Sequence, residues 1–193
     1  MKIINPALRL FLLMTILTGM AYPLFITILG HISFPDKAKG SFMVNQGEII
    51  GSALLAQKFV NNRYFWPRPS AIDYNPLPSG GSNLGPTNSE LRIEVAERMK
   101  AIEKNNPESG KVPSHLLFAS GSGLDPDISP EAARYQIDRV TLARKLDIQQ
   151  KKILIVLVEK HVEPPVWGIF GEPRVNVLRL NLALDSTFTG TDP

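Results

Sequence analysis

The chain has 193 residues, of which 44% are hydrophobic and 20% charged. This composition is typical of a globular protein with one domain of ordinary size and an appendage. The formal net charge is only +3 and the basic residues are not clustered, which argues against nucleic-acid binding. There is no cysteine, so disulfides, thiolate catalysis and cysteine zinc sites are excluded.

The N-terminal region predicts a membrane-spanning helix. Between Arg9 and Asp36 the chain carries no Lys, Arg, Asp or Glu, and about 20 apolar residues suffice to cross the ~30 Å hydrocarbon core. A cleaved signal peptide is the alternative, but its apolar region would be shorter, and no A-x-A-like cleavage site precedes Asp36. We expect residues 1–35 to form an N-terminal tail and an uncleaved span over about residues 8–32.

The charges that flank this span give a small orientation signal. Lys2, Arg9 and the terminal amine lie on one side, and Lys37 and Lys39 on the other. The positive-inside rule therefore favours a cytoplasmic N-terminus and an extracytoplasmic domain over residues 36–193. Because a single span cannot enclose a transport pathway, any transport role requires partner subunits.

After the span, residues 42–44 and 48–50 are short strand candidates on either side of an Asn45-Gln46-Gly47 turn. Ser52 is then placed to cap a short helix through about Asn61. A segment rich in proline, glycine and aromatic residues follows, "YFWPRPSAIDYNPLPSGGSNLGPTN", which cannot form a regular helix.

A long helix is expected after this segment. Thr87 and Glu90 fit a capping box, and the helix should extend to about Lys104. Its apolar positions form one stripe: Leu91, Val95, Met99 and Ile102.

The next elements are marked by caps and apolar runs. Residues 116–119 suit a buried strand, and Ser129 followed by Pro130 predicts a helix start. The helical spacing that follows is carried by Ala133, Ile137, Val140 and Ala143 or Arg144. Asp147 and Gln150 predict a second capping box for a helix over residues 148–161, although residues 153–156 also suit a buried strand.

The last element expected is a hairpin. Residues 166–170 would pair with residues 175–182 across Gly171-Glu172-Pro173, with a bulge where the alternation slips at Val177-Leu178. Together these elements predict a mixed α/β (α+β) domain with a small sheet, preceded by one N-terminal transmembrane helix.

Nucleotide-binding motifs are incomplete. A P-loop requires G-x-x-x-x-G-K-[ST], but in "NNPESGKVP" Asn105 replaces the first glycine and Val112 the hydroxyl residue. The sequence "SGGSNLG" has no lysine and no preceding strand. Its polar and glycine residues fit tight turns, or alternatively a ligand or partner contact made through the backbone: Ser79, Gly80, Gly81, Ser82 and Asn83.

Catalytic and metal motifs are incomplete too. Ser122 misses the G-x-S-x-G pattern, and the three histidines, His31, His115 and His161, have no ligand-like spacing. "DPDIS" has Pro130 where a calcium loop requires glycine. The C-terminal "TGTDP" lacks the Asp-Lys pair of the D-K-T-G-T phosphorylation loop of P-type pumps. We therefore expect no catalytic residue and no metal site in this chain.

Several stretches together resemble a known family: "GSALLAQKF", "YFWPRPSA", "SGGSNLGPTN", "ASGSGLDPDISPEAARYQIDRV" and "GEPRVNVLRLNLALD". In order and spacing they are similar to the C subunit of the bacterial Kdp potassium-transporting P-type ATPase, over essentially the whole chain. The resemblance implies a complex of four subunits in the bacterial inner membrane. Its other members are a channel-like subunit that carries potassium, a P-type ATPase subunit that hydrolyses ATP, and a small peptide.

The same resemblance implies a non-catalytic accessory subunit needed for assembly, with ATP and potassium handled at the level of the complex. The family is described as a catalytic chaperone that raises the ATP affinity of the pump subunit, and a glutamine matching Gln136 has been linked to nucleotide. A domain outside the membrane cannot touch cytoplasmic ATP, so a cap over the potassium entrance is the favoured mechanism. A direct nucleotide-binding module and an anchored extracytoplasmic enzyme stay open.

The aromatic part of the irregular segment has two interpretations. Tyr64, Phe65, Trp66 and Arg68 are residue types enriched at the centres of protein interfaces, and the neighbouring prolines would reduce the entropy lost on docking. The alternative is that these aromatics fill the core of the domain itself.

Overall fold

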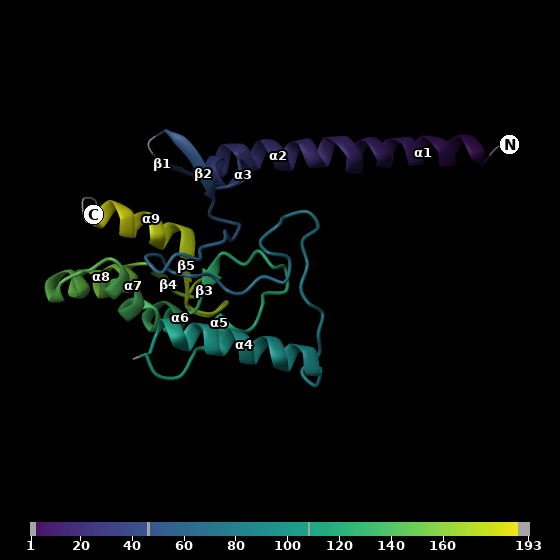
Figure 1. Ribbon diagram of the computed structural model, residues 1–193. Coiled ribbons are helices and arrows are strands. Elements are labelled where there is room, and N and C mark those ends of the chain that lie inside the picture. The colour runs from purple at the N-terminus through teal and green to yellow at the C-terminus, as the bar shows by residue number, and fades with distance from the viewer. Residues whose placement is uncertain (1–2, 46, 108, 189–193) are drawn as a thin grey trace. The chain divides into compact units, whose positions relative to one another are not determined.

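The computed structural model describes residues 3–45, 47–107 and 109–188 (Figure 1). The chain forms two compact units, residues 1–52 and residues 53–193. The architecture is mixed α/β, with two small antiparallel sheets and one long apolar helix at the N-terminus, as the sequence predicts. The predicted domain boundary near residue 36 stays a prediction.

The first unit begins with a continuous helix of 30 residues, Ile4–Ser33, drawn from purple to blue in Figure 1. It consists of α1 (Ile4–Ile16), a π-helical turn (η1, Leu17–Ala21) and α2 (Tyr22–Ser33). A rise of about 1.5 Å per residue makes it long enough to cross a bilayer core of ~30 Å. Pro23 lies in the first turn of α2, directly after the π-helical turn, which is where a helix accommodates a missing backbone donor.

The threonine side chains of this helix form hydrogen bonds within the helix itself. The hydroxyls of Thr15, Thr18 and Thr27 each donate to the carbonyl four residues earlier, at 2.7–2.8 Å. No threonine donor on the described helix is therefore left unpaired toward lipid. The predicted span over about residues 8–32 falls within this helix, which is a candidate membrane span by length and composition.

A short helix, α3 (Pro35–Ala38), leads into an antiparallel hairpin of β1 (Phe42–Asn45) and β2 (Glu48–Ser52). The predicted hairpin is confirmed, although Gln46 of its turn lies outside the described residues. The predicted helix from Ser52 to about Asn61 is wrong. Ser52 is the last residue of β2, its hydroxyl donates to the carbonyl of Gly40 at 2.7 Å, and residues 53–60 lie in no helix.

The segment after Ser52 is instead irregular, and a distant part of the chain holds it in place. Ala53 and Ala56 are buried, and the backbone N–H of Ala56 donates to the carbonyl of Leu124 at 2.9 Å. A helix would use this N–H internally, so the tertiary contact overrides the apolar spacing that suggested one.

The second unit contains six helices and three strands among its described residues. In chain order they are α4 (Ser89–Asn105), α5 (Ser114–Leu117), β3 (Asp127–Ile128), α6 (Pro130–Tyr135), α7 (Ile137–Ala143), α8 (Ile148–Lys160), β4 (Val162–Glu163), β5 (Arg174–Asn176) and α9 (Val177–Thr187). The strands form one antiparallel sheet in the order β3-β5-β4, and α8 packs against α6, α7 and α9. Figure 1 shows the long irregular segment, without helix or strand, that precedes α4.

One hydrophobic core unites these elements. Its central side chains, with no exposed surface or almost none, come from the sheet, from α6 to α9 and from the irregular segment before α4: Phe65, Ile128, Ala132, Ala133, Val140, Leu154, Val158, Val175, Leu180 and Leu184.

Two predicted helix starts are confirmed. The Ser129 hydroxyl accepts a hydrogen bond from the N–H of Ala132 at 3.1 Å, with Pro130 in the first turn. Asp147 and Gln150 form the reciprocal capping box at 2.8 and 2.9 Å, so the strand alternative for residues 153–156 is wrong. The helix expected around residues 133–144 is interrupted at Gln136, which ends α6 and precedes α7.

The start of α4 is shifted by one residue from the predicted capping box. Asn88 caps the helix, and its side chain accepts from the N–H of Glu90 at 2.7 Å, so the pairing of Thr87 with Glu90 is wrong. Asparagine and threonine are both good caps, so the sequence pattern alone did not separate the two registers. The predicted end near Lys104 is confirmed, because α4 ends at Asn105.

The predicted strand over residues 116–119 is wrong, because residues 114–117 form the single turn α5, which begins after Pro113. The predicted C-terminal hairpin is also wrong. β5 ends at Asn176, whose side chain accepts from the N–H of Arg179 at 3.1 Å and so caps α9. The slip in alternation marked a helix rather than a bulge, because the residues buried on α9 follow helical spacing, three or four positions apart, and not strand alternation. They are Val177, Leu178, Leu180, Asn181 and Leu184.

Candidate functional site

The aromatic segment crosses the interior of the second unit instead of projecting from it. We call residues 62–68 the strap; it lies in no helix or strand. Phe65 has 0% exposed surface and Pro67 is buried, while Trp66 is half-buried. Phe65 therefore has no surface to offer a partner, which corrects its prediction as an interface residue. Because the strap has no neighbouring strand, its buried backbone groups need side-chain partners.

Asn181 of α9 supplies those partners for Phe65. Its Oδ1 accepts from the N–H of Phe65 at 2.8 Å, and its Nδ2 donates to the carbonyl of Phe65 at 3.0 Å. The Asn181 side chain is buried, so this pair of bonds replaces the ladder that a neighbouring strand would provide.

Gln136, at the break between α6 and α7, pairs with the backbone of Trp66 in the way that Asn181 pairs with Phe65. Its Oε1 accepts from the N–H of Trp66 at 2.7 Å, and its Nε2 donates to the carbonyl of Trp66 at 3.1 Å. The second donor reaches the carbonyl of Ala132 at 3.1 Å, and Oε1 also accepts from Arg139 at 2.6 Å. An amide side chain has two donor and two acceptor positions, and here all four are used inside the core.

Arg139 of α7 places a charged guanidinium beside the same part of the strap. It is only 3% exposed, and its Nη1 donates to the carbonyls of Asn62 and Tyr64 at 2.8 and 3.0 Å. Its guanidinium lies 3.8 Å from the centroid of the Trp66 ring, a cation–π distance. Burial lowers the pKa of Arg139 to about 9, so the side chain is still charged at neutral pH. Among the described residues, none of its hydrogen bonds reaches a carboxylate.

The two ends of the strap are fixed by further arginines. Arg144 donates through Nε to the carbonyl of Arg63 at 2.8 Å and pairs with Asp185, which also accepts from the hydroxyl of Tyr64 at 3.1 Å. Burial, followed by the charge of Asp185, raises the pKa of Tyr64. At the other end Arg68 pairs with Asp125 at 2.9 Å. The hydroxyl of Tyr64 and the Nη1 of Arg68, both predicted interface residues, are thus engaged within the chain itself.

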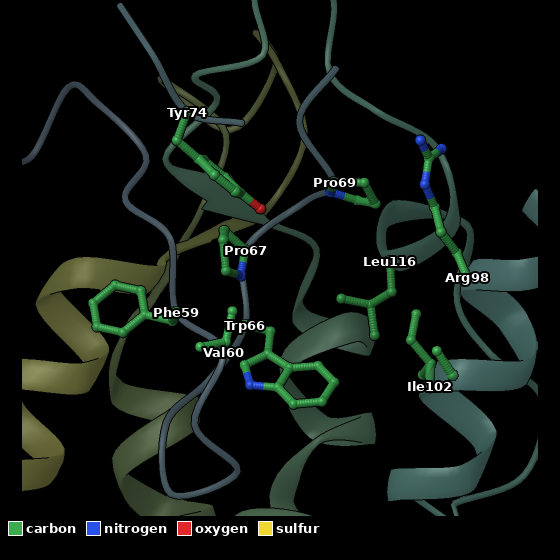
Figure 2. A pocket seen from close by; sticks show the side chains of 10 residues that line it. Phe59, Val60, Trp66, Pro67, Pro69, Tyr74, Arg98, Ile102 and Leu116 are labelled. Carbon is green, nitrogen blue, oxygen red and sulfur yellow. The ribbon is translucent and has the colours of Figure 1, made fainter. Parts of the chain in front are cut away.

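A pocket of about 250 Å³ lies between the strap and α4 (Figure 2). Trp66, Pro67 and Tyr74 face it from the irregular segment, and Ile102 and Leu116 from the helical side, as the close-up shows. The remaining lining residues are Phe59, Val60, Pro69, Arg98 and Ala101. The pocket is therefore mostly apolar and suits an apolar group.

The polar groups that line this pocket are already occupied. Arg98 pairs with Glu94 at 2.6 Å and donates to the carbonyl of Leu117 at 3.2 Å. The hydroxyl of Tyr74 donates to the carbonyl of Arg68 at 2.8 Å, and burial raises the pKa of Tyr74 to about 12. Arg98 is the only charged lining residue among those described, so the pocket lacks the donor set of a phosphate site.

The "SGGSN" stretch packs against the loop at residues 120–124. The N–H of Gly80 donates to the carbonyl of Ser122 at 3.0 Å, and a Cβ at Gly81 would lie 3.0 Å from the carbonyl oxygen of Gly121. Gly123, with φ of +70°, leaves even less room, because a Cβ there would lie 2.5 Å from Ile72. These glycines permit close backbone approach, which supports the structural-turn interpretation. Whether the surrounding residues, Ser79, Ser82 and Asn83, contact a partner stays a prediction.

No group of three His, Cys, Asp or Glu side chains lies together in the described part of the chain in a way that could hold a metal ion. The "TGTDP" motif lies outside the described residues. The site is thus a buried polar framework around the strap with an apolar pocket beside it, and among the described residues it contains no group arranged for catalysis.

Comparison with known proteins identifies the family. The family described as "K+-transporting ATPase, c chain" matches residues 4–186. The chain belongs to this family. Curated relatives named "Potassium-transporting ATPase KdpC subunit" agree: the protein from Rhodospirillum rubrum is 50% identical over 191 residues, covering 97% of each chain. Those from Dechloromonas aromatica and Variovorax paradoxus are 47% and 49% identical, over 95% and 96% of this chain and 97% of each relative.

Membership in the K+-transporting ATPase c chain family confirms the resemblance found in the sequence. It supports an accessory subunit of a potassium pump, and the apolar N-terminal helix fits membrane association. The sequence reasoning missed the residues that hold the strap: Arg139, Arg144, Asn181 and Asp185. Arg144 was the available signal, because a charged residue there falls on the helical spacing of Ala133, Ile137 and Val140. Asn181 gave no such signal, because residues 175–182 were predicted to be a strand.

Proposed function

We propose that this chain is a non-catalytic subunit of a four-subunit potassium-transporting ATPase of the bacterial inner membrane. Its domain would lie outside the cytoplasm and cap the potassium entrance of the channel-like subunit. Its other partners would be the P-type ATPase subunit and the small peptide subunit. Effects on ATP affinity, the catalytic-chaperone role described for this family, would then reach the ATPase subunit indirectly, through the assembled complex.

The observation that carries this proposal is the environment of Gln136. The side chain is 1% exposed and uses both donors and both acceptor positions inside the core. A nucleotide could bind this amide only if two backbone bonds of Trp66 were broken and the core opened. Because buried groups left without partners cost about 1–3 kcal/mol each, such contact is disfavoured. Gln136 therefore acts as a structural clamp, and its loss would change the complex through the strap.

The orientation is supported by flanking charge. Arg9 and the terminal amine precede the span, and Lys37 and Lys39 follow it, which is a small difference in favour of a cytoplasmic N-terminus once Lys2 is counted. ATP is cytoplasmic, so sidedness decides between a potassium-entrance cap and a nucleotide-binding module.

Sidedness can be measured with cysteine labelling, because the native chain has no cysteine. Lys111 is exposed in the second unit and Asn5 is exposed in the first turn of α1. In intact spheroplasts an impermeant maleimide should label Lys111→Cys, whereas Asn5→Cys should react only after permeabilisation. The reverse pattern would place the domain with cytoplasmic ATP and remove the cap.

The cap itself can be tested by photo-crosslinking in the assembled complex. Val60 lies at the pocket beside the strap and is 71% exposed. A photoreactive phenylalanine analogue at this position should give an adduct with the channel-like subunit. An adduct with the cytoplasmic part of the ATPase subunit would contradict the proposal.

A further inference from the structure

A compact apolar tip projects from the second unit between β4 and β5. We call residues 166–170, "VWGIF", the tip. Its four large side chains are strongly exposed: Val166 50%, Trp167 86%, Ile169 78% and Phe170 61%. None of them belongs to the described hydrophobic core. Single exposed apolar residues are ordinary, but four together on one short loop indicate a contact surface.

The tip has a defined backbone shape. The N–H of Val166 donates to the carbonyl of Phe170 at 2.8 Å, and the reverse bond measures 3.0 Å. The N–H of Ile169 returns to the carbonyl of Val166 at 3.2 Å and closes a tight turn over Trp167 and Gly168. The rings of Trp167 and Phe170 meet edge to face with centroids 6.0 Å apart. Little conformational freedom therefore remains to be lost when the tip binds.

The turn also holds a bulky residue in an unfavourable conformation. Trp167 has φ of +55° and Gly168 has φ of +74°. The left-handed region suits glycine, whereas a tryptophan there is uncommon, and such residues concentrate at functional sites. The strain points the large Trp167 ring into solvent, where it contributes nothing to the core.

Charges lie beside the tip but not on it. Residues 164–171 contain no Lys, Arg, Asp or Glu. At the base, Glu163 pairs with Arg174 at 3.0 Å and with Arg179 at 2.9 Å. The end of the tip is apolar and uncharged and carries an indole N–H, and its base is charged. Membrane interfaces show the same order of apolar, tryptophan and charged groups.

We propose that the tip inserts into the headgroup–acyl boundary of the bilayer in which this chain is anchored. A lipid surface is the occupant because the same chain carries a candidate membrane span, and an indole among uncharged apolar side chains suits the membrane interface. Because the candidate span belongs to the same chain, the tip is tethered to that bilayer, and tethering would reinforce weak insertion. This inference rests on the membrane anchor of the proposed function, and it adds a second membrane contact.

The test uses the full-length chain reconstituted in phosphatidylcholine vesicles with brominated acyl chains, which quench tryptophan on contact. Trp66 and Trp167 are the only tryptophans. Emission from Trp66→Phe, which retains Trp167, should be lower in brominated than in unbrominated vesicles, because Trp167 would lie at the boundary with the acyl chains. Emission from Trp167→Phe, which retains Trp66, should hardly change. If Trp66→Phe fails to fold, the difference between the native chain and Trp167→Phe supplies the Trp167 signal.

Two controls separate the tip from the anchor. Phe25→Trp in a chain lacking both native tryptophans reports whether the candidate span is in the bilayer. Ile169→Glu should abolish quenching of Trp167, whereas Ile148→Glu, at an equally exposed site on α8, should not.

The outcomes distinguish the two proposals. Quenched emission from the Phe25→Trp chain together with unquenched Trp167 overturns the tip proposal and leaves the anchor intact. Unquenched emission from the Phe25→Trp chain removes the anchor and with it the basis of both proposals. Trp167 emission shifted to the blue without quenching, seen only with the partner subunits, would also overturn lipid insertion and indicate a protein contact.

Discussion

Replacing Asn181 by alanine should remove both partners of the buried Phe65 backbone. Among the described residues, the N–H and carbonyl of Phe65 bond only to this side chain, at 2.8 and 3.0 Å. Each buried backbone group left unpaired costs about 1–3 kcal/mol, so the substitution should lower the free energy of unfolding by about 2–6 kcal/mol. A domain has about 5–15 kcal/mol in total, so this is a large loss.

Thermal unfolding of the full-length chain in detergent, followed by circular dichroism, measures this loss. For a unit of this size about 1 kcal/mol corresponds to roughly 3 °C, so Tm should fall by about 6–18 °C. Gln149→Ala is the matched control, because it also removes an amide side chain from a helix but at an exposed position of α8, and it should change stability by less than about 0.5 kcal/mol. A fall in Tm for Asn181→Ala no larger than for Gln149→Ala would refute the view that Asn181 holds the strap.

Three further outcomes follow from the structure. Gly123→Ala should lower the free energy of unfolding by about 2–4 kcal/mol in chemical denaturation, because the φ of Gly123 is +70° and the new Cβ would lie 2.5 Å from Ile72. Gly80→Ala is the control and should be nearly neutral, because nothing lies near its new Cβ. Equal effects of the two substitutions would contradict the close-approach argument. Ser129→Ala should cost about 1 kcal/mol through loss of the cap on α6, and an unchanged denaturation midpoint would show that the cap bond is not formed in solution. The raised pKa of Tyr74, about 12, means that the stability it contributes is complete below pH 10 and is lost as the pH rises towards 12; Tyr74→Phe should lack this loss in alkaline unfolding curves, and an identical pH dependence in both chains would count against burial of the hydroxyl.

Local signals in the sequence predicted the elements whose ends are fixed by neighbouring residues. The capping box of Asp147 and Gln150 and the Ser129-Pro130 start are short-range chemistry, so they were readable without tertiary information. Residues 116–119 and 175–182 were misread because short apolar runs suit a strand and a buried helix equally well. The cap at Asn176 and the spacing of Leu180 and Leu184 would have favoured the helix.

The strap could not be predicted, because its partners are distant in sequence. Phe65 and Asn181 are 116 residues apart, and Trp66 and Gln136 are 70 apart. No periodicity connects such pairs, and an aromatic segment between prolines has the same composition whether it docks on a partner or fills the core of its own domain. Burial of Phe65 favours the core interpretation for that residue, while partly exposed Trp66 keeps a face on the pocket.

The central claim, that Gln136 works through the strap and not through nucleotide, is tested most directly by comparing two variants of the assembled pump. Gln136→Ala and Asn181→Ala each remove the two bonds that clamp one strap residue. Of the two, only Gln136 matches the glutamine that the family resemblance associates with nucleotide. The measurement is the apparent KM for ATP of the potassium-stimulated ATPase, normalised to the amount of intact complex. We predict that both variants leave this KM unchanged or shift it by the same factor. A rise of about tenfold, equivalent to about 1.4 kcal/mol, in Gln136→Ala alone would contradict the account and assign Gln136 to the nucleotide.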